Sequence, residues 1–309
     1  MSVLVAADFS EAEWDAWWPA LHAALPGVTL VRDTCDAPAI EIALVANPPQ
    51  GLLATLPRLR FIQSLWAGVD RLLADASTPP HIPLARMVDP VMSQAIAQTA
   101  LWAVLGLHRD YFDYAAQQHR REWQQHAQRR ADEITVAVLG LGEMGRGAAL
   151  RLASNGYRVI GWSTRPVALN GVTTRAGAAA LALLLGEAEI VVNLLPLTAA
   201  TRGLFSRQTF SAMHRGASLV NLGRGGHVVE ADLLAALAAG QLRRAVLDVF
   251  EHEPLAPDHA FWAHAQVTVL PHIAALTDPR SAAQVVARNV RALRDGAPLA
   301  HLVDRSRGY

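Results

Sequence analysis

Short apolar runs alternate with segments of helical periodicity along most of the chain. Among the first hundred residues, strand-like runs are expected at 3–6, 28–31, 40–46 and 61–65, and residues 11–24 favour a helix. Apolar strands that alternate with helices are typical of a parallel sheet covered on both faces. The first part of the chain therefore predicts a mostly parallel α/β domain.

A strong helix start follows at Asp89-Pro90, where Asp would supply the N-cap and Pro the first helical position. The apolar periodicity continues from there towards Tyr114. The polar run at residues 117–132 lacks a core pattern and predicts an exposed helix end and a linker. We expect the long helix to bridge two domains, with the domain change near residue 100.

The second half repeats the alternation of strands and helices. Strands are expected at residues 134–139, 157–162, 190–195, 218–222, 245–249 and 267–270, and helices at 181–185, 207–213, 230–239 and 279–295. The predicted fold is α/β, with two doubly wound parallel-sheet (Rossmann-like) domains and an interlobe active-site cleft. The first domain comprises residues 1–99 and is completed by residues 280–309, and the second comprises residues 100–279.

The stretch ITVAVLGLGEMG joins a buried-type strand to a glycine turn of the form G-x-G-x-x-G and to the start of a helix. Gly140 would permit the tight turn, Gly142 would let a pyrophosphate approach the backbone, and Gly145 would let helix and strand pack closely. Glu143 and Met144 complete the turn at the helix N-terminus, where phosphates bind. The context predicts a dinucleotide site. We therefore assign residues 100–279 as the NAD(P)-binding domain and residues 1–99, completed by 280–309, as the substrate-binding domain.

Composition removes several alternatives. The formal net charge is zero, which gives no electrostatic footprint for nucleic acid or a membrane surface, and the single cysteine, Cys35, suits a reducing cytoplasm. The most apolar region, residues 176–197, is too interrupted by charged residues to span a membrane. The chain contains no lysine, which excludes Schiff-base enzymes, P-loop NTPases and protein kinases. No metal site is expected.

Residues that follow the second strand of the nucleotide-binding domain bear on the choice of dinucleotide. An acidic residue there would bind the ribose 2′-hydroxyl of NAD, whereas this chain has Ser163-Thr164-Arg165. Hydroxyls and an arginine suit the 2′-phosphate, so NADP is the expected cofactor and NAD the alternative. Leu195, Pro196 and Thr201, after the next strand, would line the adenosine half of the site.

Chemistry-bearing side chains follow the later strands. Arg224 stands between glycines after residues 218–222, in the run Leu222-Gly223-Arg224, and suits a bidentate clamp on a carboxylate. Several acidic residues follow the strand at 245–249, and His272 follows the strand at 267–270. Together, an arginine, a carboxylate and a histidine could supply an anion clamp and a general acid.

The chain resembles the D-isomer-specific 2-hydroxyacid dehydrogenase family, and within it the glyoxylate/hydroxypyruvate reductase A group. The resemblance rests on GLGEMG, NLLPLTAATRGLF, VNLGRGGHVVEADLLAAL, LDVFEHEPL and LPHIAALT, with WSTRP and the closing VDRSRGY pointing to the group. It covers nearly the whole chain and is strongest over residues 134–309.

The resemblance implies roles for single residues. The catalytic arginine, glutamate and histidine of the family fall on Arg224, Glu253 and His272, and its nicotinamide-facing aspartate falls on Asp248. The glycine of the substrate loop falls on Gly68. The expected substrate-binding set is Trp66, Ala67, Gly68, Val69, Arg224 and His272, and the cofactor-binding set includes Leu222, Gly223 and Asp248.

Two positions depart from the family pattern and leave the substrate open. Asn47 replaces a larger aromatic or histidine stretch, and Gln98 stands where many members place a glutamate. The implied reaction is NADPH-dependent reduction of a short 2-keto acid, glyoxylate to glycolate or hydroxypyruvate to D-glycerate, in a cytoplasmic homodimer.

Several alternatives stay open at this point. They are a related dehydrogenase of another 2-hydroxy acid, a non-catalytic NAD(P)H-binding regulator on the same scaffold, and phosphite or formate oxidation by the same fold. A Rossmann methyltransferase is disfavoured, because it would leave the arginine and histidine without a role.

Overall fold

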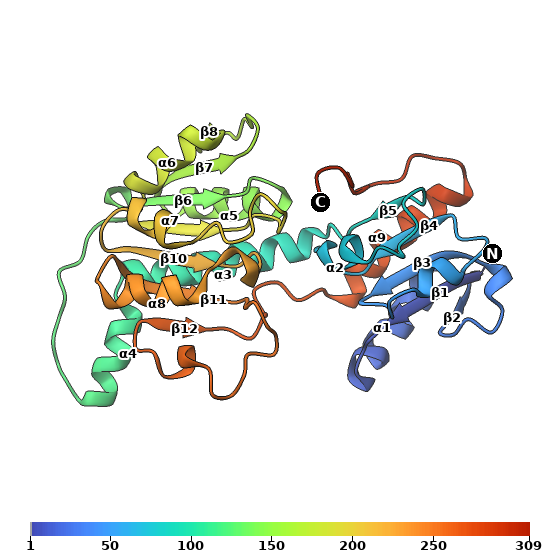
Figure 1. The fold of residues 1–309 in the computed structure, drawn as a ribbon, viewed down its shortest axis with the longest axis horizontal. Helices are drawn as coiled ribbons and strands as arrows, with labels where there is room; N and C mark the ends of the chain where they lie inside the picture. Colours follow the sequence, from blue (N-terminus) through green and yellow to red (C-terminus); the bar gives the residue numbers. More distant parts are fainter. Residues whose placement is uncertain (1) are drawn as a thin grey trace. The chain divides into compact units, whose positions relative to one another are not determined.

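A computed structural model describes residues 2–309, and the chain divides into two compact units (Figure 1). Unit 1 comprises residues 1–92 and 277–309, and unit 2 comprises residues 93–276. Both divisions lie a few residues before the boundaries expected near 100 and 280. At the first, the helix that begins at Pro90 enters the core of unit 2 from Ile96 onwards. The two parallel sheets confirm the predicted α/β class.

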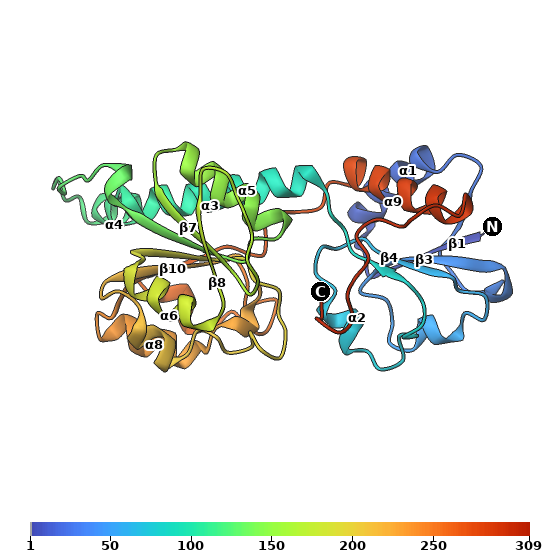
Figure 2. The same cartoon turned by 90° about the horizontal axis from the view of Figure 1, so that it is seen from above.

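Unit 1 is built on a five-stranded parallel sheet in the order β2-β1-β3-β4-β5. Its buried core includes Leu4, Ala43 and Ile62 from the central strands. In Figure 2, α9 lies alongside α1 on one side of this sheet. The bounds are β1 Ser2–Ala7, α1 Glu11–Ala24, β2 Thr29–Val31, β3 Ile40–Ala46, β4 Phe61–Ser64, α2 Asp70–Ala74, β5 Leu84–Ala85 and α9 Pro279–Arg294.

Unit 2 holds a seven-stranded parallel sheet in the order β12-β11-β10-β9-β6-β7-β8. Its strand bounds are β6 Thr135–Leu139, β7 Arg158–Ser163, β8 Thr173–Ala176, β9 Ile190–Asn193, β10 Ala217–Asn221, β11 Leu242–Leu247 and β12 Val267–Val269. The chain reverses its direction of winding between β6 and β9, which are neighbours in the sheet. Ligands of doubly wound sheets bind at such a switch point, at the carboxyl ends of the strands.

Helices cover both faces of the sheet of unit 2. Figure 2 shows α3 and α5 on one face and α6 and α8 on the other. Successive β6 residues alternate between two apolar cores, with Val136 and Val138 packed under the first pair of helices and Ala137 and Leu139 under the second. The helix bounds are α3 Pro90–His108, α4 Tyr111–Arg120, α5 Glu143–Ser154, α6 Ala178–Glu187, α7 Arg207–Ala212 and α8 Glu230–Ala238.

The helix that begins at Pro90 differs from the prediction at its far end. Asp89 accepts a hydrogen bond from the N–H of Val91 at 3.0 Å, which confirms the predicted N-cap. Helix α3 stops at His108 instead of continuing to Tyr114, because Asp110 adopts a left-handed conformation with a φ of 57°. By length and composition α3 could cross a membrane, but in unit 2 it contributes Ala100, Ala103 and other buried residues to the core.

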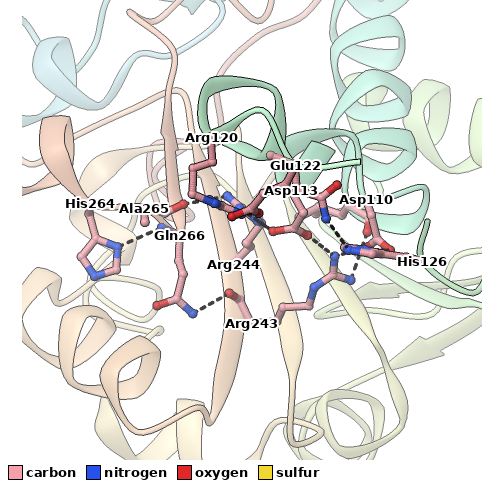
Figure 3. A network of polar contacts seen from close by, with 12 residues as sticks. Asp110, Asp113, Arg120, Glu122, His126, Arg243, Arg244, His264, Ala265 and Gln266 are labelled. Atoms are coloured by element: carbon pink, nitrogen blue, oxygen red, sulfur yellow. Dashed lines mark hydrogen bonds and ion pairs between the residues drawn. The ribbon is translucent and has the colours of Figure 1, made fainter. Parts of the chain in front are cut away.

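A polar network ties the start of α4 to β11 (Figure 3). Asp110 forms an ion pair with Arg243, and its carboxylate also contacts Nδ1 of His126 at 3.0 Å. Asp113 binds Arg243 and Arg244 at 2.7 Å each. The turn at Asp110 is therefore held by charges from a strand more than a hundred residues away in the chain.

Candidate active site

His272 and Glu253 form a hydrogen-bonded pair in the loops that follow β12 and β11 of unit 2. His272 Nδ1 lies 2.6 Å from Glu253 Oε2, while the N–H of Phe250 donates to Glu253 Oε1 at 2.9 Å. The side chain of His272 is 50% exposed, and the ring atom that contacts Glu253 is Nδ1. The pair has the geometry of a general acid whose imidazole is oriented by a carboxylate.

The backbone around His272 is held by Asp248. The N–H of His272 donates to the Asp248 carbonyl at 2.9 Å, and the N–H groups of Ile273 and Ala274 donate to its carboxylate at 2.8 and 3.1 Å. His272 itself has a φ of 55°, a conformation that L-residues rarely adopt. Asp248 thus fixes a strained turn at His272. The contact of its buried carboxylate with nicotinamide stays a prediction.

The two carboxylates have pKa values shifted in opposite directions. Burial favours the neutral form of both side chains. For Glu253, hydrogen bonds from His272 and Phe250 and the charge of Arg224 outweigh burial and hold the pKa below its ordinary value. For Asp248, burial dominates the hydrogen bonds from Ile273 and Ala274 and raises the pKa. Glu253 is therefore the anionic partner of His272.

Arg224 extends from the end of β10 and is half-buried, with Nη1 donating to the Gly223 carbonyl at 2.8 Å. Its charge acts on Glu253, so the structure brings together the arginine, glutamate and histidine singled out in the sequence. The neighbouring glycine makes this possible. A β-carbon at Gly225 would lie 1.8 Å from the carbonyl carbon of Phe250, so only glycine lets the two loops approach this closely.

The glycine turn has the predicted local structure. Gly140 has a φ of 94°, and a β-carbon at Gly145 would lie 1.6 Å from the Gly140 oxygen, so both positions require glycine. A β-carbon at Gly142 would meet no atom within 4 Å, and the exposed Glu143 opens α5 directly after it. The open backbone before a helix N-terminus fits a bound phosphate. Met144 packs against the α3–α5 core.

Ser163, Thr164 and Arg165 lie at the carboxyl end of β7, beside the glycine turn of β6. Ser163 Oγ donates to the Arg165 carbonyl at 2.5 Å, which closes a short exposed turn. Within residues 2–309 no carboxylate forms an ion pair with Arg165. The exposed guanidinium and the adjacent hydroxyls therefore fit an additional phosphate group.

The loop after β9 runs along the same edge of the sheet. Leu195 is buried, and Thr201 folds the loop back by donating to the Pro196 carbonyl at 2.7 Å. Leu222 and Gly223 continue from β10, and Gly223 packs against the Leu195 carbonyl. These predicted cofactor-binding residues lie together at the carboxyl ends of β9 and β10.

The expected substrate-binding residues of unit 1 follow β4 and lead into α2; they are Trp66, Ala67, Gly68 and Val69. The indole of Trp66 packs edge-on against Phe9, and the backbone N–H of Trp66 donates to Ser64 Oγ at 3.1 Å. In the described part of the chain, the N–H groups of Ala67, Gly68 and Val69 have no protein acceptor. Asn47, also in unit 1, donates to the carboxylate of Asp8 at 3.2 Å, and Gln98 is exposed on α3 of unit 2.

Three buried polar residues next to Arg224 escaped the sequence analysis. Asn193 ends β9, Asn221 ends β10, and His227 lies three residues after Arg224; all three are fully buried. The sequence holds a signal for two of them, because the apolar strands in IVVNLLP and LVNLGRG both end in asparagine. Among the described residues, no group of three or more His, Cys, Asp or Glu side chains is placed to hold a metal ion.

Comparison with known proteins gives consistent matches. Residues 101–274 match the model of the D-isomer specific 2-hydroxyacid dehydrogenase NAD-binding domain. Glyoxylate/hydroxypyruvate reductase A from Serratia proteamaculans (strain 568) is 40% identical over 279 residues, which cover 89% of each chain. The protein of the same name from Yersinia enterocolitica is 36% identical over the full length of both chains.

Solved structures match over the whole chain as well. A D-isomer specific 2-hydroxyacid dehydrogenase from Xanthobacter autotrophicus Py2, in complex with NADPH and MES, has a TM-score of 0.95 at 40% identity and covers 100% of this chain and 99% of its own. An NADPH-dependent glyoxylate/hydroxypyruvate reductase from Sinorhizobium meliloti, with NADP and sulfate, has a TM-score of 0.94 at 35% identity and the same coverage.

Proposed function

The chain belongs to the D-isomer-specific 2-hydroxyacid dehydrogenase family and to its glyoxylate/hydroxypyruvate reductase A group, and we propose that it reduces glyoxylate and hydroxypyruvate with NADPH. The observation that carries the proposal is the 2.6 Å pair of His272 and Glu253 beside Arg224. A non-catalytic regulator would have no need of an oriented, half-exposed imidazole next to an arginine.

NADPH is the proposed cofactor. The glycine turn at Gly140–Gly145 would hold the pyrophosphate at the N-terminus of α5, and Ser163, Thr164 and Arg165 would bind the 2′-phosphate. The relatives from Xanthobacter autotrophicus and Sinorhizobium meliloti support this choice, since their structures were solved with NADPH and with NADP, respectively. When bound, the cofactor supplies the hydride that is added to C2 of the keto acid.

The side chains of unit 2 would supply binding and proton transfer. Arg224 would bind the substrate carboxylate through its planar fork and polarise the adjacent carbonyl group. His272 would donate a proton from Nε2 to the oxygen on C2, because its Nδ1 is engaged by Glu253. Glu253 would stabilise the imidazolium before transfer, and its lowered pKa keeps it ionised for that task.

We keep Trp66, Ala67, Gly68 and Val69 as the proposed substrate loop of unit 1. The unpaired N–H groups at Ala67, Gly68 and Val69 could donate to a substrate carboxylate. A charged carboxylate gains more from such donors than a neutral group does. The loop would therefore favour 2-keto acids over the matching aldehydes or ketones.

The direct test is an assay that follows NADPH consumption with glyoxylate, hydroxypyruvate and pyruvate as substrates. Turnover of the first two, with product identified as glycolate and D-glycerate, would support the proposal. Absence of turnover with each of the three acids, while NADPH still binds, would contradict it and favour a regulatory role.

We further propose that the protein is a cytoplasmic homodimer that associates through unit 2. Support comes from large apolar side chains exposed on α3, α4 and the segment after them: Trp102 at 45%, Tyr111 at 53% and Trp123 at 96%. Aromatic residues are enriched at protein–protein interfaces, so these three side chains are the proposed dimer contacts. Light scattering on the purified protein, with Trp123→Ala as the comparison, would test the dimer, and cell fractionation would test the location.

A further inference from the structure

A fully buried polar network lies directly behind Arg224. Asn193 Nδ2 donates to Asn221 Oδ1 at 2.8 Å and contacts His227 Nδ1 at 3.0 Å, so one amide group bridges the other two side chains. All three residues are inaccessible to solvent. A buried polar network is costly unless its members are paired, and the bonds in this one are distributed over two strand ends and the loop that carries Arg224.

Backbone groups fix the orientation of every member. The N–H of Leu195 donates to Asn193 Oδ1 at 3.3 Å, and the N–H of Gly223 donates to Asn221 Oδ1 at 3.3 Å, so each amide oxygen is identified by a donor. The N–H of Arg224 donates to His227 Nδ1 at 3.2 Å. A nitrogen that accepts from a backbone N–H carries no proton, so His227 is neutral and protonated on Nε2.

The two faces of the imidazole therefore serve two different loops. Nδ1 accepts from the backbone of Arg224, while Nε2 donates to the Pro196 carbonyl at 3.2 Å. Asn221 holds the same arginine from the other side, because its Nδ2 donates to the Arg224 carbonyl at 3.0 Å. The peptide groups on both sides of Arg224 are thus tied to the network, and Pro196 belongs to the loop expected to line the cofactor.

We propose that His227, together with Asn193 and Asn221, is a positioning network that fixes the Arg224 backbone against the Leu195–Pro196 loop. The network sets the direction of the guanidinium that binds the substrate relative to the loop that lines the cofactor. This inference rests on the proposed function for the roles of Arg224 and Pro196. A catalytic contact with substrate is not assigned to His227, since it is completely enclosed.

The absence of a side chain at Gly223 lets the backbone pack directly against Asn193 and His227. A β-carbon there would lie 3.1 Å from Asn193 Nδ2 and 3.2 Å from His227 Cε1, tighter than ordinary contacts. The backbone before Arg224 therefore rests directly on the network. Small displacements of Asn193 or His227 are transmitted to Arg224 without an intervening flexible side chain.

Two amide substitutions separate the two faces of the imidazole. In His227→Asn the side-chain oxygen replaces Nδ1 and keeps the acceptor for Arg224, but the donor to Pro196 is lost. In His227→Gln the longer side chain places its amide near Nε2 and keeps the donor to Pro196, but the acceptor for Arg224 is lost. The quantities to be measured are KM and kcat for glyoxylate, the Kd for NADPH by fluorescence titration, and Tm. His214→Gln, an exposed histidine of unit 2, is the matched control.

The network predicts opposite patterns for the two variants. His227→Gln should raise KM for glyoxylate about tenfold and lower kcat several-fold while the Kd for NADPH stays within about twofold, because the backbone N–H of Arg224 loses its acceptor. His227→Asn should weaken NADPH binding about tenfold and leave the KM for glyoxylate near the wild-type value. If His227→Gln fails to fold, Asn221→Asp takes its place. Asn221→Asp loses the donor to the Arg224 carbonyl and should show the pattern expected of His227→Gln.

Other outcomes would overturn the inference. Equal losses of substrate and cofactor affinity in both variants, with a common fall in Tm, would mean that the network only stabilises the fold. Unchanged constants in folded variants would mean that it positions nothing. If the wild-type protein itself reduces neither glyoxylate nor hydroxypyruvate, the proposed function fails, whereas the NADPH affinities of the two variants still test the link between His227 and Pro196.

Discussion

The Nδ1 atom of His272 lies 2.6 Å from Oε2 of Glu253, although the two residues sit in different loops of unit 2. Asp248 holds the first loop through the N–H groups of Ile273 and Ala274, and the N–H of Phe250 holds the carboxylate of Glu253. Both partners are thus fixed by backbone bonds, as a pair that transfers a proton requires.

Replacing His272 should abolish most of the turnover and spare cofactor binding. His272→Ala removes the proposed proton donor, so kcat for glyoxylate should fall by about two to four orders of magnitude. The Kd for NADPH should change little. His252→Ala, an exposed histidine one residue from Glu253, is the control and should keep near wild-type turnover. Comparable losses in both variants would contradict the assignment.

The lowered pKa of Glu253 has a consequence for stability at acid pH. A carboxylate with a depressed pKa in the folded state stabilises that state above its ordinary pKa, and the contribution disappears as the pH falls through the depressed value. The Tm of the wild type should therefore exceed that of Glu253→Gln at neutral pH, and the difference should shrink below about pH 4. A difference in Tm that persists or grows in acid would contradict the lowered pKa of Glu253.

Arg165 should determine the preference for NADPH. Arg165→Ala removes the cation expected at the 2′-phosphate, so the Kd for NADPH should rise by about ten- to a hundredfold. Affinity for NADH, which lacks that phosphate, should be unaffected. Arg151→Ala, in the last turn of α5, gives a matched loss of charge. Equal weakening of both cofactors by Arg165→Ala would argue against the specific contact.

The network in Figure 3 should be a main source of stability for unit 2. The side chain of Arg244 is only 8% exposed, and Asp113 binds it at 2.7 Å. Asp113→Ala would leave this guanidinium buried without its carboxylate and should lower the free energy of unfolding by about 3 kcal/mol. Asp132→Ala removes an exposed pair with Arg130 and should have little effect in the same urea titration. Equal small effects would show that Arg244 does not depend on Asp113.

Local patterns were sufficient for most of the fold. The apolar periodicity predicted α1 and β3 with the bounds that the structure has, Glu11–Ala24 and Ile40–Ala46. The edge strand β8, Thr173–Ala176, was not predicted, because its polar residues carry no apolar alternation. The predicted end of α3 was also wrong. The turn that ends this helix is held by an ion pair between Asp110 and Arg243, which are 133 positions apart in the chain.

The residues of the candidate site were likewise predicted only in part. Strand ends could be predicted, and residues just past them, such as Arg224 and His272, were therefore found from the sequence. His227 was missed because its role depends on Asn193 and Asn221, which reach it through side-chain bonds between separate strands. Bonds of this kind leave no periodic mark in the chain.

The most direct test of the account is a comparison of kcat/KM for glyoxylate and hydroxypyruvate with NADPH and with NADH. The account predicts measurable turnover of one or both acids and a kcat/KM with NADPH at least about tenfold above that with NADH, the effect of one well-placed contact to the 2′-phosphate. A clear preference for NADH, or no turnover of either acid with either cofactor, would contradict it.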